Sequence, residues 1–248
     1  MDISKLKVDI ERCDAFVFDG DDTTWRDRAM KGYGGKLIPH EILRGPKHWG
    51  HAWHGIKRYG DVLEAAKRSD ADGLKEFFDI VGEIQCADRD FAYNATKAHI
   101  WKHRFEGVPE FIEYLNRIGD VYIVTVSSDI AVDAAKDTFG FADGAGNPVT
   151  YYDPEEENPI IKGCEIKIRD GADKLNATKT LLEEHGYLLE NCGVFGDSVL
   201  DSQAMGAAKL SIASPAADHK VIEYADHHIQ NYETFAGALE KLGVLSAK

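Results

Sequence analysis

The chain lacks the features that mark a secreted or membrane-bound protein. Its 248 residues include four cysteines, which are scattered and form no Cys-x-x-Cys pair. We therefore expect reduced thiols rather than a disulfide framework or a zinc site. No apolar run reaches the roughly 18 residues of a transmembrane helix. The segment 1–11 lacks the apolar stretch of a secretory signal, so the sequence predicts a cytoplasmic protein with no membrane partner.

Positive charge is also scarce. The formal net charge is −14, and an acidic protein repels nucleic acid and anionic membranes, so neither is an expected partner. One segment departs from this balance, because residues 26–58 contain eight Lys or Arg residues against two acidic ones. A basic patch on an acidic protein suits a small anion, but it is equally typical of a solvated face.

Apolar residues are plentiful enough for a sizeable core, at 44% of the chain. Short apolar runs alternate with stretches of helical periodicity, which is the pattern of parallel strands covered by helices on both faces. The sequence therefore predicts an α/β fold with a doubly wound, Rossmann-like parallel sheet. The expected strands are 15–18, 121–124, 193–195, 210–213 and 228–229, and the clearest expected helices are 74–81, 111–118, 130–139, 175–185 and 232–242.

The interval 26–104 contains no good strand and reads as helix with Gly-rich breaks. It falls between the first and second expected strands, where an insertion stands above the carboxyl ends of the strands. We therefore expect a helical cap domain at 26–104, inserted into an α/β core formed by 1–25 and 105–248. Within the cap, residues 44–58 are rich in His, Trp and basic residues. The tryptophans suit the core of a small cap, and a substrate role for the basic residues stays open.

Polar side chains gather just past the expected strands and at one helix start. In chain order they are Asp19, Asp21, Thr125, Lys174, Asp197 and Asp201. Asp-rich turns are usually structural on their own, but two acids at i and i+2 can also supply a nucleophile, an acid–base group or a cation site. Acids, a hydroxyl and an amine at the carboxyl edge of one sheet favour a catalytic site.

The order and spacing of these residues resemble the haloacid-dehalogenase-like superfamily. The matching motifs are Asp19-x-Asp21-x-Thr23, Thr125, Lys174 and Gly196-Asp197-x-x-x-Asp201. The resemblance covers about residues 14–30 and 106–214. Within the superfamily, residues 124–132 and the interval from Lys174 to Asp197 are similar to those of phosphoserine phosphatases. The resemblance implies a magnesium-dependent phosphohydrolase that acts on a small phosphorylated metabolite.

The resemblance also implies a catalytic role for four residues. Asp19 would be the nucleophile that forms an aspartyl-phosphate, and Asp21 would protonate the leaving oxygen and then activate water. Thr125 and Lys174 would bind the phosphoryl group, with Ser127 as a further substrate-binding residue. Ser127 or Ser128 could take the place of Thr125 if the strand ends later than expected; their other role would be to cap the next helix.

The implied metal is Mg²⁺, with Asp19, Asp197 and the backbone carbonyl of Asp21 as ligands and Asp201 close to them. The chemistry is consistent, because Mg²⁺ prefers hard oxygen ligands and removes the repulsion between a phosphate dianion and a carboxylate nucleophile. The transition state spreads negative charge over the phosphoryl oxygens, and an ammonium and a hydroxyl can meet that charge.

One position departs from phosphoserine phosphatases. They carry a Glu nine positions after the nucleophile, where it meets the substrate amine, whereas this chain has Arg28. Val126 and Ser127 also stand where they have two glycines. An Arg suits an added carboxylate or phosphate better than an amine. We therefore expect Arg28 to bind substrate and an anionic sugar or acid phosphate to be preferred.

Other functions fit parts of the pattern. A phosphomutase would share every core residue and stays open. A dehalogenase on the same fold lacks the second acid, so Asp21 argues against it. A signalling receiver domain phosphorylates an Asp in mid-chain and is about half as long. A non-catalytic phospho-ligand binding protein is favoured by no residue, although the residues alone do not prove turnover. The sequence does not indicate an oligomeric state.

Overall fold

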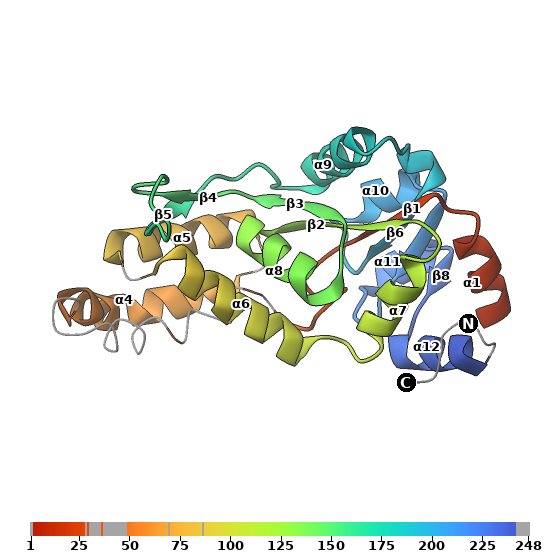
Figure 1. The fold of residues 1–248 in the computed structure, drawn as a ribbon, viewed down its shortest axis with the longest axis horizontal. Coiled ribbons are helices and arrows are strands. Elements are labelled where there is room, and N and C mark those ends of the chain that lie inside the picture. The colour runs from red at the N-terminus through yellow and green to blue at the C-terminus, as the bar shows by residue number, and fades with distance from the viewer. Residues whose placement is uncertain are drawn as a thin grey trace.

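The structure is a computed structural model that describes residues 2–27, 29, 36, 49–68, 70–85 and 87–241. The molecule is elongated, with a layered α/β body at one end and a group of helices at the other (Figure 1). The helices are α1 (Ile3–Ile10), α4 (Trp49–Lys67), α5 (Ala71–Ile84), α6 (Arg89–His103), α7 (Val108–Leu115), α8 (Asp129–Phe139), α9 (Gly171–Glu184), α10 (Ser202–Ala207), α11 (His219–Tyr224) and α12 (Tyr232–Lys241), with a short 3-10 turn η2 at Leu189–Asn191.

The body is built on a six-stranded parallel sheet in the order β3-β2-β1-β6-β7-β8. The strands are β1 (Ala15–Phe18), β2 (Asp120–Ser128), β3 (Asp143–Asn147), β6 (Gly193–Gly196), β7 (Leu210–Ala213) and β8 (His227–His228). The predicted doubly wound, Rossmann-like α/β fold is thereby confirmed, together with all five predicted strands. Strand β2 is longer than predicted, and the edge strand β3 was not predicted.

Alternate residues of the strands face opposite sides of the sheet, and helices cover both sides. Phe16 and Phe18 of β1 pack in a cluster with α1, α7, α8 and α12, whereas Ala15 and Val17 pack in a second cluster with α9, α10 and α11. Phe18 stacks on Phe195 of the neighbouring strand with ring centroids 4.0 Å apart. This two-sided burial explains why the central strands are apolar throughout.

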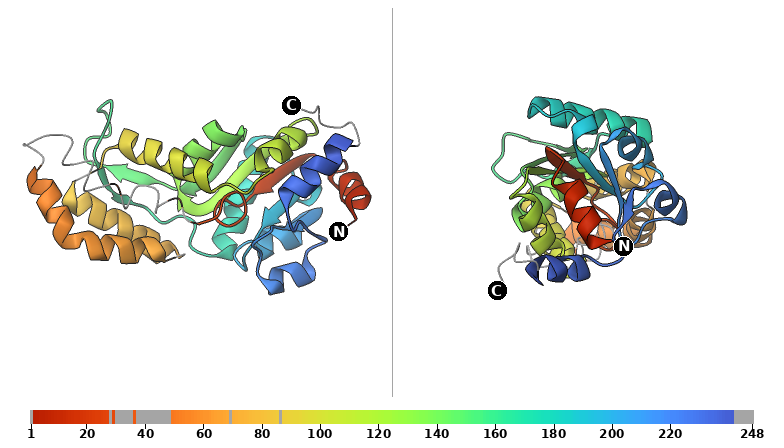
Figure 2. Two further views of the ribbon diagram at one scale, coloured as in Figure 1. Left: turned by 90° about the horizontal axis from the view of Figure 1, so that it is seen from below. Right: turned by 90° about the vertical axis from the view of Figure 1, so that its right-hand side faces the viewer.

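A third apolar cluster lies at the other end of the molecule. It joins α4, α5 and α6 to the antiparallel pair β4 (Val149–Tyr151) and β5 (Ile161–Cys164). Helices α4 and α5 lie side by side beyond the end of the sheet (Figure 2). Strand β5 packs closely on α5, because a Cβ on Gly82 would lie 1.9 Å from the carbonyl oxygen of Lys162. The hairpin at 149–164 therefore shares a core with these helices, although it is far from them in sequence.

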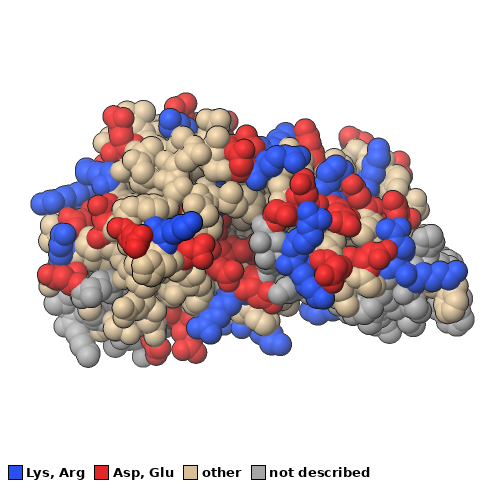
Figure 3. Space-filling view, turned by 180° about the vertical axis from the view of Figure 1, so that it is seen from behind, with Lys and Arg blue, Asp and Glu red and all other residues tan. Residues whose placement is uncertain are grey.

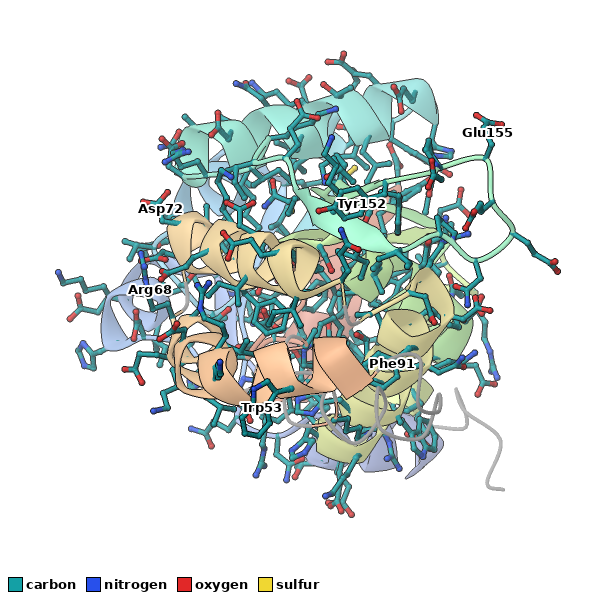
Figure 4. All side chains as sticks on the ribbon, turned by 90° about the vertical axis from the view of Figure 1, so that its left-hand side faces the viewer. Trp53, Arg68, Asp72, Phe91, Tyr152 and Glu155 are labelled. Atoms are coloured by element: carbon teal, nitrogen blue, oxygen red, sulfur yellow. The ribbon has the colours of Figure 1, made fainter. Side chains whose placement is uncertain are left out.

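The position of Trp53 contradicts one expectation. Trp53 was expected in the core of the cap, but its side chain is 61% exposed and points outward from α4, on the side of α5 opposite Tyr152 (Figure 4). Lys57 lies 5.7 Å from the Trp53 ring, and Arg58 pairs with Asp61 and Glu83 at 2.7 and 2.6 Å. These two basic residues thus have local contacts on the helix surface.

Helix ends follow ordinary capping rules. Asp70, Asp88 and Asp170 accept backbone hydrogen bonds at the starts of α5, α6 and α9. Helix α8 begins at Asp129, but its N-cap is Ser128, whose hydroxyl accepts a hydrogen bond from the Ala131 N–H at 3.4 Å. Gly140 ends the same helix with φ of 81°. Among the described residues, no helix has the length and apolar character needed to cross a bilayer.

Candidate active site

Two of the predicted acids stand where neighbouring parallel strands end. Asp19 directly follows β1 and Asp197 directly follows β6, and the two strands are neighbours in the sheet. The backbone N–H of Asp19 donates to the carbonyl of Phe195 at 3.0 Å, which extends the ladder by one residue and holds the two ends together. Acidic side chains gather near the middle of one face, between the sheet body and the end of the molecule that carries α4 and α5 (Figure 3).

Lys174 lies between two buried carboxylates. Its ammonium forms ion pairs with Asp19 and with Asp201, the latter at 2.5 Å. All three side chains are buried, with exposed fractions of 7% or less. Lys174 occupies the first turn of α9, which is fixed by Asp170 accepting from the N–H groups of Ala172 and Asp173. Helix α9 thus brings an amine to the carboxyl edge of the sheet.

Burial and like charge both act on the carboxylates. Burial and the nearby Asp201 raise the pKa of Asp19 to about 7, although Lys174 opposes the shift. Burial, with the charges of Asp19 and Asp201, raises the pKa of Asp197 to about 9. Burial would lower the pKa of Lys174, but the two carboxylates that it contacts outweigh burial and raise this pKa above its usual value. Without a cation, the carboxyl groups of Asp19 and Asp197 therefore keep their protons to a higher pH than ordinary carboxyl groups do.

Asp201 is held in place by several hydrogen bonds. One carboxylate oxygen accepts from the N–H groups of Asp197 and Ser198 at 3.2 and 3.1 Å and from the Ser198 hydroxyl at 3.1 Å. The other oxygen contacts Lys174. A side chain at position 196 would collide with it, because a Cβ on Gly196 would lie 2.4 Å from the Asp201 Cβ. The glycine in the motif is thus required by the close approach of Asp201.

Three residues of the loop after β1 form hydrogen bonds that orient the acids. The sequence did not predict these contacts. Thr23, a motif residue without a predicted role, donates its hydroxyl hydrogen bond to Asp197 at 3.1 Å. Trp25 donates its indole N–H to Asp21 at 2.7 Å, and the Thr24 hydroxyl donates to the Asp19 carbonyl at 2.7 Å. An aromatic residue in this loop carries no sequence signal for a contact with the acid four residues earlier.

The hydroxyl residues of β2, namely Thr125, Ser127 and Ser128, make different contacts. Thr125 is fully buried, and its hydroxyl would lie 3.2 Å from a Cβ on Gly20, so it stands beside the residue that follows Asp19. It accepts a hydrogen bond from the Ser127 N–H at 3.1 Å. Ser128 caps α8 instead, as the alternative role in the sequence suggested. Arg28, the remaining predicted substrate-binding residue, lies outside the described residues.

Three carboxylates could hold one metal ion. Asp19, Asp197 and Asp201 each offer an oxygen, and these oxygens lie within 4.8 Å of one another. Clustered carboxylate oxygens suit a hard divalent cation such as Mg²⁺, and a cation would relieve the like-charge repulsion that helps to raise the pKa values of Asp19 and Asp197. The carboxylate of Asp21 points elsewhere, accepting from Trp25 and from the Ala29 N–H at 3.2 Å. Asp21 would therefore contribute to a metal site through its backbone carbonyl rather than its carboxylate.

Known proteins share this architecture. The family model of haloacid dehalogenase-like hydrolases matches residues 164–242, which include Lys174, Asp197 and Asp201. A phosphoserine phosphatase in its apo form superimposes with a TM-score of 0.62 over 92% of this chain and 98% of its own, at 19% identity. The fold is that of a haloacid dehalogenase-like hydrolase. The resemblance that the motifs indicated is thus confirmed.

Two further structures are similar to this chain. A structure described as a phospho-aspartyl intermediate analogue of phosphoserine phosphatase matches with a TM-score of 0.61 at 19% identity, over 93% of this chain and 99% of its own. A structure described as a HAD family hydrolase from Salmonella enterica serovar Typhi matches with a TM-score of 0.63 at 16% identity, over 89% of this chain and 69% of its own. No curated protein matches the chain in sequence. These likenesses establish the fold.

Proposed function

We propose that this chain is a Mg²⁺-dependent phosphohydrolase that cleaves a small phosphate monoester through an aspartyl-phosphate on Asp19. The observation that carries the proposal is the buried group of Asp19, Lys174 and Asp201 beside Asp197 at the carboxyl edge of the sheet. The similarity to a phospho-aspartyl analogue of phosphoserine phosphatase supports the same chemistry in this chain.

In the first step, an oxygen of Asp19 attacks phosphorus and the bond to the leaving oxygen breaks. Asp21 donates a proton to that oxygen, which would otherwise leave poorly as an alkoxide. The hydrogen bonds from Trp25 and the Ala29 N–H hold the Asp21 carboxyl in one orientation. In the second step, Asp21 takes a proton from water and the water oxygen attacks phosphorus. The bond between phosphorus and the Asp19 oxygen breaks, which releases phosphate and regenerates the Asp19 carboxylate.

Lys174 and Thr125 would bind the phosphoryl oxygens, with Ser127 beside them. The raised pKa of Lys174 keeps its side chain an ammonium, so a positive charge faces the oxygens where negative charge develops. The ion pair between Lys174 and Asp19 supports this role, because it holds the ammonium beside the proposed nucleophile.

The metal would be held by Asp19, Asp197 and Asp201 together with the carbonyl of Asp21. When bound, Mg²⁺ supplies positive charge that lets a carboxylate approach a phosphate dianion. Thr23 fixes the orientation of Asp197, and the hydrogen bonds from Ser198 fix Asp201. These contacts keep the three oxygens close despite their mutual repulsion.

The substrate would be enclosed by a cap. We propose that residues 26–104 form this domain and that 1–25 and 105–248 form the core, with the β4–β5 hairpin packed on the cap helices. Arg28 belongs to this segment, and we propose that it binds a second anionic group of an anionic sugar or acid phosphate. Arg28→Glu should then weaken the binding of doubly anionic substrates selectively, as measured by KM across a substrate series.

The test is phosphate release from a panel of monoesters, with Mg²⁺ and with metal removed. We expect metal-dependent release by the wild type and a loss of at least about 10³-fold in Asp19→Asn. Asp22→Asn is the matched control in the same loop, because Asn tolerates the left-handed φ of 58° at that position. Equal losses in both variants, or release that needs no metal, would contradict the mechanism.

Failure of well-folded protein to release phosphate from any monoester would point to the alternatives that share this fold. Conversion of one sugar phosphate into its isomer would identify a phosphomutase, and halide release from halo-acids would identify a dehalogenase. Binding of a phosphorylated ligand without turnover would identify a binding protein.

A further inference from the structure

A pocket of about 420 Å³ lies beside the acidic site, at the same edge of the sheet. Its walls include Arg26, the segment 102–106, Pro215 and the segment 230–232. Pro215 follows β7 and residue 230 follows β8, so the pocket stands past the carboxyl ends of these strands, toward the edge of the sheet. None of the predicted catalytic residues lines it. The volume is within the range of small-ligand sites.

The pocket is basic, unlike the protein as a whole. Arg26, Lys102, His103 and Arg104 line it, against the single acid Glu106, in a chain of net charge −14. Within the described ranges, no carboxylate forms an ion pair with Arg26, Lys102 or Arg104. Most other arginines of the described chain do pair; Arg58, for example, contacts two carboxylates.

Aromatic contacts hold two of these guanidinium groups in place. Arg26 lies 5.0 Å from the centroid of the Phe105 ring. Arg104 lies 3.8 Å from the centroid of the Trp101 ring and donates to the Trp101 carbonyl at 2.6 Å. Such contacts order a long side chain without neutralising its charge. The two arginines are therefore preorganised cations whose charge no described carboxylate offsets.

Helix electrostatics explain only part of this arrangement. Lys102 and His103 occupy the last turn of α6, where positive charge is favourable. Arg26 comes from a different segment, which is held beside the end of α6 by a hydrogen bond from its N–H to the His103 carbonyl at 2.8 Å. Arg104 has left the helix with φ −55° and ψ 151°. Two segments thus bring their arginines to one pocket.

We propose that this pocket binds a small phosphoryl-bearing anion at a site separate from the catalytic carboxylates. Arginine forks match phosphoryl oxygens in geometry, and the side-chain amides of Gln230 and Asn231 in the wall add uncharged donors. The pocket is near the catalytic residues but distinct from them. Buried Tyr232 lies in its wall and donates to the Thr23 carbonyl at 3.2 Å, and Thr23 in turn contacts Asp197.

The test is a calorimetric titration of metal-free protein with pyrophosphate and, separately, with inorganic phosphate. Metal is removed by a chelator that is then dialysed away, and NaCl keeps the ionic strength constant because exposed charges are screened by salt. Removing the metal removes the cation that would attract an anion to the catalytic carboxyl groups, so saturable binding is expected to report the basic pocket. We expect one saturable site in the wild type, bound about tenfold or more weakly in R26Q/R104Q.

The matched control is R68Q/R117Q, which removes the same charge from exposed arginines of other segments and should leave affinity within about twofold. Lys174→Met should also retain pyrophosphate binding. Loss of binding in Lys174→Met but not in R26Q/R104Q would place the anion at the catalytic site and overturn the proposal. So would unchanged affinity in R26Q/R104Q, or no saturation in the wild type. Because no turnover is measured, the result is independent of the proposed hydrolysis.

Discussion

The carboxyl edge of the sheet carries two charged sites of opposite sign that are built differently. The acidic site is buried, and its ammonium is paired at short range with Asp19 and Asp201. The basic pocket is more open, and within the described chain Arg26 and Arg104 meet aromatic rings rather than carboxylates. A buried charge is costly unless an opposite charge lies beside it, as in the first site. Water screens the charges of the second site, so they need no such partner.

The largest effect should come from removing the one cation of the acidic site. Lys174→Met leaves buried carboxylates uncompensated, so we expect metal-free protein to lose about 3–5 kcal/mol of unfolding free energy, together with nearly all activity. Lys179→Met, on the same helix but exposed, should change stability by less than about 0.5 kcal/mol. Denaturant melts of both variants make this comparison. A small effect in Lys174→Met would show that the acidic site does not need its cation.

A slightly smaller effect is expected when Asp201 is displaced sterically. A methyl group at Gly196 collides with the Asp201 side chain, so Gly196→Ala should cost about 2–4 kcal/mol and weaken Mg²⁺ binding, as measured by thermal melts and calorimetry. Gly206→Ala in α10 is the control, because no atom lies within 4 Å of its Cβ position. The control should gain about 0.5–1 kcal/mol from helix propensity.

The orientation of Asp21 can be tested without changing any charge. Trp25→Phe removes the indole donor from Asp21 while keeping an aromatic ring against Phe139, whose ring it stacks on at 6.4 Å. We expect kcat to fall about tenfold with the Mg²⁺ affinity unchanged. Trp101→Phe, at the exposed contact with Arg104, should leave kcat unaffected. A Trp25→Phe enzyme with normal kcat would show that this hydrogen bond does not position the acid.

A further predicted effect concerns the pH dependence of stability in metal-free protein. The folded-state pKa values of Asp19 and Asp197 are raised to about 7 and about 9, above the unfolded value of about 3.9. Their protonation therefore stabilises the fold at low pH, and this stability is lost as pH rises through the folded values. We expect a loss of at least about 1 kcal/mol between pH 5 and pH 9, and a larger gain in Tm from Mg²⁺ at the higher pH.

Asp197→Asn provides the control for this pH dependence. It removes the group with the larger shift, so its stability should fall less steeply between the same pH values. The basic pocket should not contribute, because it contains no buried carboxylate. An identical pH slope in wild type and Asp197→Asn would mean that the acidic site does not govern the stability of the metal-free protein.

The sequence indicated the positions of Asp19 and Asp197, because each follows directly after a short apolar strand. Asp19 and Asp197 needed only strand periodicity and the position of polar residues to be placed at one edge. Strand β3 was missed because its sequence is Asp-Gly-Ala-Gly-Asn, which no strand rule favours. It forms because its glycines allow close packing; a Cβ on Gly144 would lie 2.5 Å from a methyl group of Ile123.

The sequence by itself determined the α/β class with a parallel sheet, the two strand ends that carry acids, and the helix that carries Lys174. Only the tertiary structure decided which partners these groups have: Asp201 for Lys174, Trp25 for Asp21, and Arg26 beside Arg104 in a basic pocket. The physical reason is that the interactions involved join residues at different separations along the chain. Strand and helix formation depend on neighbours in sequence, whereas a charge pair or a pocket depends on distances that exist only once the sheet and helices have packed.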